Sequence, residues 1–166
     1  MERKLYIIRH GKSSWDHVDL DDIDRPLAER GTRNAGEMAQ RLKELNLVPG
    51  LIFSSPAARA LGTARIMAGI WDLDPGSLQI HEELYMAYVS EIAEVVGSVP
   101  AEADSLAIFG HNPSFTLYAN TFLDEPLDNL PTAGVVVVTL ESDSWEGAGR
   151  KQVVHTYVDI PKKKRH

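Results

Sequence analysis

Short apolar runs alternate along this chain with longer segments in which apolar residues recur at helical spacing. Continuous apolar runs are typical of buried central strands, and they occur at 5–8, 51–53 and 106–109. Apolar residues three or four positions apart predict helices over 35–45, 60–71 and 90–96. Strands that alternate with helices indicate an α/β fold, so we expect a three-layer α/β/α sandwich with a mainly parallel sheet.

Two of the predicted strands are followed by residues that favour the start of a helix. In Ser54-Ser55-Pro56, a serine stands at a cap position and Pro56 at the expected first helical position; Asn112 and Pro113 form a similar pair. Each of these strands is therefore predicted to lead directly into a helix.

The last part of the chain predicts two more strands, at 135–138 and 153–158, joined by a turn at Gly147 and Gly149. We expect this last pair to be antiparallel. No repeat or linker divides the chain, so residues 1–160 are predicted to form a single domain. Basic residues then dominate the tail 161–166, which we expect to be a solvated terminus.

Composition excludes several classes of protein. Seventeen basic and 24 acidic residues give a formal net charge of −7, which argues against a nucleic-acid partner. The absence of cysteine rules out disulfides, thiol nucleophiles and cysteine metal sites. No apolar stretch is long enough for a signal peptide or a membrane span. We therefore expect a cytoplasmic monomer that binds neither nucleic acid nor membrane.

Histidine and arginine side chains gather where three predicted strands end. The three segments are Arg9-His10-Gly11-Lys12-Ser13, Ser54 to Arg59, and Gly110-His111-Asn112-Pro113. Ligands of open α/β sheets bind beyond the carboxyl ends of the strands, where these segments should meet. Arginine side chains and helix N-termini together favour a tetrahedral oxyanion, and a phosphoryl group is the expected ligand.

The sequence does not support a nucleotide-binding loop or a metal site. Gly11-Lys12-Ser13 resembles the end of a Walker A loop, but Tyr6 stands where that motif requires a glycine. The remaining histidines share no metal-ligand spacing, so we predict neither a metal nor another cofactor; they are His17, His81, His155 and His166. The aspartates between Asp16 and Asp24 are predicted to form a solvated loop.

The three segments, in this order and each after a predicted strand, resemble the histidine phosphatase superfamily, also called the phosphoglycerate mutase-like family. The segment Ser54-Ser55-Pro56-x-x-Arg59-Ala60-x-x-Thr63-Ala64 carries the second part of the likeness. The compact chain, with Asp24-Arg25-Pro26-Leu27 near its start, is most similar to SixA-like phosphohistidine phosphatases. The resemblance implies a phosphoglycerate mutase-like fold over nearly the whole chain.

The resemblance also implies a role for individual residues. His10 would be the nucleophile, attacking through a neutral nitrogen and carrying the phosphoryl group, and His111 would bind that group. Arg9 and Arg59 would hold the phosphoryl oxygens as charge shifts in the transition state. Gly11, Lys12 and Ser13 lie close enough in sequence to line the same pocket.

A proton donor is expected from the pair Glu82 and Glu83. Glu83 fits the family pattern better, although a solvated edge carboxylate is the alternative. Tyr85-Met86-Ala87-Tyr88 replaces the glycine and tryptophan usual in the family, which argues against sugar-phosphate mutase activity. A phosphohistidine substrate releases a neutral imidazole, which needs little protonation as it leaves, so a phosphohistidine phosphatase can act without a strong proton donor.

These observations predict a metal-independent phosphatase with a phospho-His10 intermediate. The expected partner is a protein that carries phosphohistidine. A phosphomonoesterase acting on a small phosphorylated metabolite is the alternative enzyme. A non-catalytic phosphate-binding module is a third reading, which the complete set of Arg9, His10, Arg59 and His111 disfavours.

Overall fold

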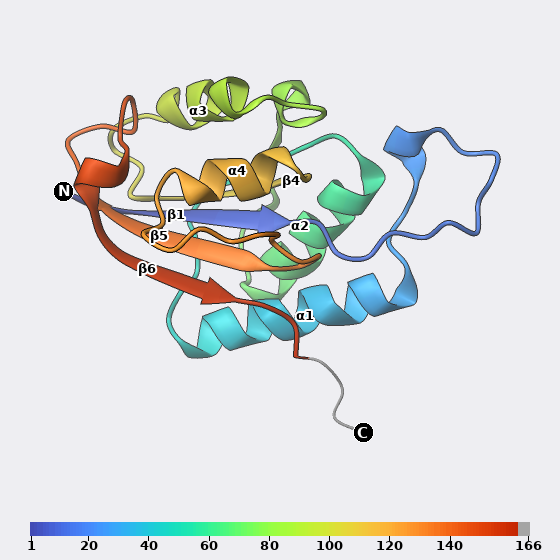
Figure 1. The fold of residues 1–166 in the computed structure, drawn as a ribbon. Helices are drawn as coiled ribbons and strands as arrows, with labels where there is room; N and C mark the ends of the chain where they lie inside the picture. Colours follow the sequence, from blue (N-terminus) through green and yellow to red (C-terminus); the bar gives the residue numbers. More distant parts are fainter. Residues whose placement is uncertain (163–166) are drawn as a thin grey trace.

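The structure is a computed structural model that describes residues 1–162. Six strands form one sheet in the order β3-β2-β4-β1-β5-β6 (Figure 1). Their bounds are β1 (Glu2–Arg9), β2 (Ile52–Ser54), β3 (Leu78–Ile80), β4 (Ser105–Gly110), β5 (Val135–Glu141) and β6 (Val153–Asp159). Of the predicted tail 161–166, residues 163–166 lie outside the described residues.

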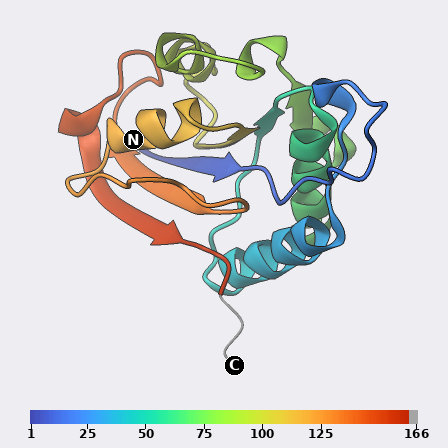
Figure 2. The same ribbon diagram turned by 45° about the vertical axis from the view of Figure 1, so that its right-hand side comes forward.

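Two pairs of helices cover the two faces of this sheet. Figures 1 and 2 show α1 and α2 on one face and α3 and α4 on the other. The helices are α1 (Glu29–Glu44), α2 (Ala58–Ile70), α3 (Val89–Gly97) and α4 (Ser114–Asn120). This arrangement confirms the predicted three-layer α/β/α sandwich.

Strand direction follows the chain in two blocks. β1, β2, β3 and β4 run parallel to one another, whereas β5 is antiparallel to both β1 and β6. The predicted antiparallel pair at the end of the chain is therefore confirmed. The sheet is mainly parallel, and its parallel part carries the segments predicted to bind the phosphoryl group.

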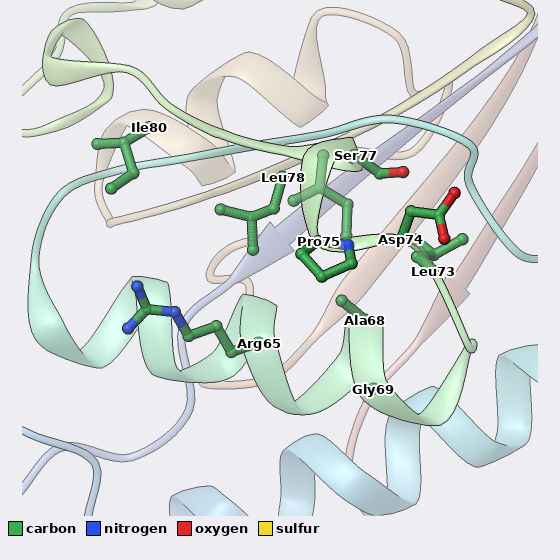
Figure 3. A pocket seen from close by; sticks show the side chains of 10 residues that line it. Arg65, Ala68, Gly69, Leu73, Asp74, Pro75, Ser77, Leu78 and Ile80 are labelled. Atoms are coloured by element: carbon green, nitrogen blue, oxygen red, sulfur yellow. The ribbon is translucent and has the colours of Figure 1, made fainter.

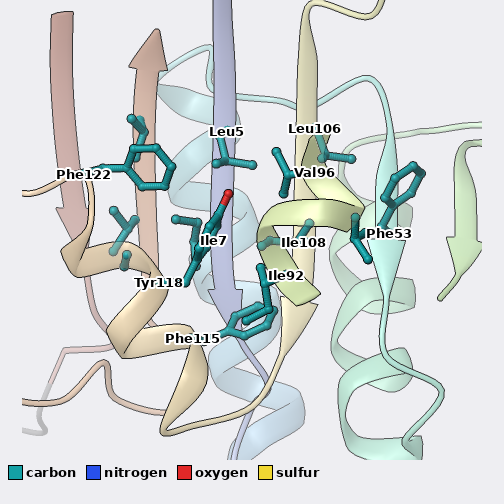
Figure 4. Packing of buried hydrophobic residues seen from close by; sticks show 14 of the residues in the cluster. Leu5, Ile7, Phe53, Ile92, Val96, Leu106, Ile108, Phe115, Tyr118 and Phe122 are labelled. Carbon is teal, nitrogen blue, oxygen red and sulfur yellow. The ribbon is translucent and has the colours of Figure 1, made fainter. Parts of the chain in front are cut away.

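The continuous apolar run of β1 is explained by burial on both faces. Leu5 and Ile7 pack with α3 and α4 (Figure 4), whereas Tyr6 and Ile8 pack with α1 and α2. All four side chains are almost fully buried. A strand covered on both faces has no polar face, so its sequence shows no alternation.

The clearest differences from the sequence prediction are the extra strand β3 and the starts of α2 and α4. β3 was not predicted, because this three-residue edge strand is half to fully exposed and shows no apolar run. β2 extends through Ser54, and α2 begins at Ala58 instead of Pro56. The Ser55 hydroxyl accepts a hydrogen bond from the Ala57 amide. α4 likewise begins one residue after Pro113.

Gly110 gives a test of how tightly the sheet packs against α4. A Cβ at Gly110 would meet the ring of Phe115, whereas a Cβ at Gly69 in α2 would meet nothing within 4 Å. We expect Gly110→Ala to lower the free energy of unfolding by about 1–3 kcal/mol through overpacking. Gly69→Ala should raise it by about 0.5–1 kcal/mol, because alanine favours the helix. Urea unfolding of both variants measures this, and equal effects would contradict the packing argument.

Candidate active site

Strand register brings His10 and His111 together. Arg9 of β1 pairs with Gly110 of β4 in a parallel register, so the next residue on each strand lies at the same edge of the sheet. The amide of His10 donates a hydrogen bond to the Gly110 carbonyl, 3.1 Å away. The two imidazole ring centroids are 5.2 Å apart. Histidines separated by most of the chain thus form one pair at the carboxyl edge.

A hydrogen bond fixes which nitrogen of His10 carries the proton. His10 Nδ1 lies 2.6 Å from the main-chain oxygen of Gly11. A carbonyl oxygen can only accept, so Nδ1 must be the protonated nitrogen. The lone pair of the neutral ring is therefore on Nε2, which is free to act as a nucleophile.

Burial and positive charge keep both imidazoles neutral. Burial lowers the pKa of His10 to about 4, and the charges of Arg59, Arg9 and Arg25 act in the same direction. Burial also lowers the pKa of His111 to about 3, helped by the neighbouring His10 and by Arg59. Both rings therefore carry no charge near pH 7, the state that nucleophilic attack by His10 requires.

Three arginines surround the histidine pair. Arg9 ends β1, and its Nη1 donates to the main-chain oxygen of Leu130 at 3.0 Å. Arg59 lies in the first turn of α2 and is 6% exposed. Arg25 comes from the loop between β1 and α1 and is 9% exposed. Two buried arginines and one half-buried arginine at one sheet edge make a pocket suited to an anion with several oxygens.

Hydrogen bonds from neighbouring segments hold this pocket together. The hydroxyl of Ser55 lies 2.8 Å from Nε2 of His111. The ring of Tyr85 packs edge-on against His111, with centroids 5.5 Å apart. The carboxylate of Asp22 accepts hydrogen bonds from Arg59, Arg25 and Tyr85. The pocket is thus lined from both strand ends, from α2 and from two loops.

The three residues after His10 differ in their placement. The Gly11 amide donates to the hydroxyl of Thr63 at 2.9 Å, so it is already engaged. A Cβ at Gly11 would lie 2.8 Å from the Gly31 oxygen, which gives this glycine a packing role. The Ser13 hydroxyl accepts a hydrogen bond from Arg25 at 2.8 Å, and the Lys12 side chain is exposed. Their roles in phosphoryl binding stay predictions.

Glu83, the predicted proton donor, points elsewhere. Its side chain is 61% exposed, and its Oε2 lies 3.9 Å from Nδ1 of His81. It lines a hollow of about 360 Å³ with residues of α3, including Glu91 and Glu94. No hydrogen bond or ion pair within residues 1–162 joins Glu83 to His10. The donor role of Glu83 therefore stays a prediction without a contact that supports it.

A second hollow, of about 430 Å³, lies between α2 and the edge strand β3. Figure 3 shows its lining, with Arg65 and Asp74 as the charged members. It contains none of the predicted site residues.

Within residues 1–162, no three histidine, aspartate or glutamate side chains gather as they would around a metal ion. No helix in the same part of the chain is long and apolar enough to cross a membrane.

Sequence reasoning missed the residues that support the pocket. It assigned no site role to Asp22, Arg25, Ser55 or Tyr85, all of which touch a predicted site residue. Only the spacing of Asp22 and Arg25, three positions apart, could have indicated their ion pair, at 3.1 Å. The other contacts join distant segments and leave no local pattern.

Comparison with known proteins agrees with this geometry. Residues 5–85 match the family model described as Histidine phosphatase superfamily (branch 1). An uncharacterized chloroplastic protein from Arabidopsis thaliana is 28% identical over 159 residues, which cover 89% of this chain and 71% of that protein. The chain spans less than a third of the length of the phosphoglycerate mutases it also matches.

Two solved structures share the fold over nearly the full length. A provisionally assigned phosphohistidine phosphatase SixA from Nakamurella multipartitia superposes with a TM-score of 0.77 at 23% identity, and 97% of each chain is covered. A second provisional SixA, from Agrobacterium tumefaciens, gives a TM-score of 0.75 at 25% identity over 93% of this chain and 97% of that one. The phosphoglycerate mutase-like architecture predicted from the sequence is therefore confirmed.

The neutral histidine pair can be tested by titration. Because burial lowers the pKa of His10 to about 4 and that of His111 to about 3, their ring NMR signals should not shift between pH 8 and about pH 5. Below pH 5 the His10 signal should begin to move. His10→Gln identifies the signal by its loss. A titration midpoint near 6.5 for His10 would contradict the buried, positively charged surroundings described above.

Proposed function

Because the chain belongs to the histidine phosphatase superfamily, we propose that it is a phosphatase that removes the phosphoryl group from phosphohistidine on a protein. Membership supports phosphatase activity that proceeds through a histidine. The observation that carries the proposal is the hydrogen bond from His10 Nδ1 to Gly11, which leaves Nε2 as a neutral nucleophile beside three arginines.

The proposed reaction has two steps. Nε2 of His10 attacks phosphorus, forming an N–P bond while the N–P bond to the substrate imidazole breaks. Water then attacks phospho-His10, which releases inorganic phosphate and restores the neutral ring. Arg9 and Arg59 stabilise the charge on the phosphoryl oxygens in both transition states. We propose that no metal ion takes part.

The surroundings of Glu83 and Asp22 support a nitrogen leaving group. Glu83 is exposed and faces His81. Hydrogen bonds from Tyr85 and Arg59 hold the pKa of the Asp22 carboxyl well below its usual range, so that Asp22 carries no proton to give. An alkoxide needs a proton as it leaves, whereas an imidazole protonated on its other nitrogen leaves neutral. This pocket therefore suits phosphohistidine better than an alkyl phosphate ester.

Trapping the covalent intermediate tests the role of His10. We expect rapid mixing with a phosphohistidine peptide, followed by alkaline quenching, to place an acid-labile phosphate on His10 in mass spectra. His10→Ala should lose essentially all turnover while remaining folded. His17→Ala, in the exposed loop, is the matched control and should keep full activity. Phosphate on another residue, or unchanged turnover by His10→Ala, would overturn the mechanism; strong inhibition by EDTA would overturn metal independence.

A series of leaving groups separates the two enzyme readings. Wild-type kcat/KM should be highest for phosphohistidine, lower for an aryl phosphate and lowest for an alkyl phosphate, because the need for a proton rises in that order. If Glu83 is the donor, Glu83→Gln should impair alkyl phosphate hydrolysis most and phosphohistidine hydrolysis least, while Glu82→Gln should change little. Equal loss on every substrate would give Glu83 a structural role. A wild type that is fastest on sugar phosphates would overturn the proposed substrate in favour of a small metabolite.

A further inference from the structure

Asp22 is the one carboxylate that contacts the arginines of the pocket in the described part of the chain. It opens the 3-10 helix η1 (Asp22–Asp24), in the loop that projects beyond the carboxyl end of β1 (Figure 1). Its side chain is 51% exposed, yet both carboxylate oxygens are engaged. Sequence composition alone makes it one of several aspartates in a solvated loop, but its contacts set it apart from its neighbours.

Asp22 holds both terminal nitrogens of Arg59. Nη1 of Arg59 donates to the main-chain oxygen of Asp22 at 2.7 Å, and Nη2 donates to Oδ2 at 2.9 Å. An arginine has five N–H donors, so these two bonds leave three for a ligand. Two bonds to one residue fix the plane of the guanidinium group as well as its position.

Asp22 is itself anchored by Arg25. Nε and Nη2 of Arg25 donate to Oδ1 of Asp22 at 3.2 and 3.1 Å, and Nη1 donates to the Ser13 hydroxyl. The guanidinium carbon of Arg25 lies 3.7 Å from the ring centroid of Trp15, a cation–π contact. Most N–H groups of Arg25 therefore donate hydrogen bonds to other residues of the protein, and these bonds keep Asp22 in place.

A third contact links Asp22 to the His111 side of the pocket. The hydroxyl of Tyr85 donates to Oδ2 of Asp22 at 2.7 Å, and its ring packs edge-on against His111. Asp22 thus joins the loop after β1, the first turn of α2 and the segment that follows β3. The negative charge also lies between Arg25 and Arg59, whose positive charges would otherwise repel each other.

We infer that Asp22 is a positioning residue, which presets the Arg59 guanidinium for the phosphoryl group through the carboxylate and main-chain contacts described above. This inference rests on the proposed phosphatase function. Asp22 does not touch the reacting atoms; it holds the group that does. Preorganised donors stabilise a transition state without reorganisation at the moment of reaction, and Asp22 supplies that preorganisation for Arg59.

Asp22→Asn is the direct test, because it keeps the size of the side chain and removes its charge. We expect kcat/KM on a phosphohistidine peptide and the affinity for tungstate, measured by calorimetry, each to fall about 10- to 100-fold. The side-chain N–H groups of Arg59 should exchange faster with solvent in NMR spectra. Asp21→Asn and Asp24→Asn are the matched controls: each removes the same charge from the same exposed loop, and neither side chain has a hydrogen bond to any of residues 1–162.

A double-mutant cycle separates positioning from a general effect on the fold. Asp22→Asn should cost little further activity in an Arg59→Lys background, because the group it positions is gone. Tyr85→Phe removes one bond to Asp22 but leaves those of Arg59, so its effect should be smaller than that of Asp22→Asn.

Three outcomes would overturn the inference. Tighter tungstate binding by Asp22→Asn would show that the carboxylate competes with the oxyanion. Equal losses of kcat/KM in Asp22→Asn and Asp24→Asn would show that Asp22 acts only through its negative charge. Unchanged exchange of the Arg59 N–H groups would show that Asp22 does not hold them. The exchange measurement needs no substrate, so it tests the role of Asp22 separately from the proposed function. If exchange is unchanged while the wild type turns over phosphohistidine, only the inference about Asp22 fails. If the wild type shows no turnover, it is the proposed function that fails.

Discussion

The parallel pairing of Arg9 with Gly110 sets the next residue of each strand, His10 and His111, side by side at the carboxyl edge of the sheet. Every other part of the pocket is arranged around this pair. α2 starts beside it and delivers Arg59, while the loop after β1 returns Arg25 and Asp22 to the same edge. A shift of one residue in this register would exchange the faces of β1 and separate the two imidazoles.

Burial of the pair has a chemical consequence as well as a structural one. The same desolvation that lowers the pKa of His10 leaves its Nε2 lone pair available at neutral pH. Arginines that lower this pKa further are also the groups suited to receive phosphoryl oxygens. In the proposed mechanism, the positive charge of the arginines therefore keeps His10 neutral for attack and also holds the oxygens of the phosphoryl group. Asp22 balances part of that charge between Arg25 and Arg59.

The sequence predicts the parts of this site that follow buried strands. Arg9, His10, Arg59 and His111 follow apolar runs or helix starts, and strand ends meet at one edge by simple geometry. β3 was missed because an exposed strand of three residues has no apolar signature. Asp22 and Tyr85 were missed because their hydrogen bond joins loops far apart in the chain, where neither spacing nor hydrophobic period carries information. Glu83 matches the family pattern in sequence, yet its side chain faces His81.

The central place of β1 also bears on how the chain is made. Of the six strands, β1 leaves the ribosome first, but its two neighbours in the sheet, β4 and β5, lie roughly 100 and 130 residues later. Its apolar residues, buried on both faces in the folded protein, have no sheet partner until most of the chain has been synthesised. During that interval the strand is an exposed hydrophobic segment with unpaired backbone groups, the kind of segment that chaperones bind. The strand that leads into His10 is thus the first of the six to be synthesised and among the last to be shielded.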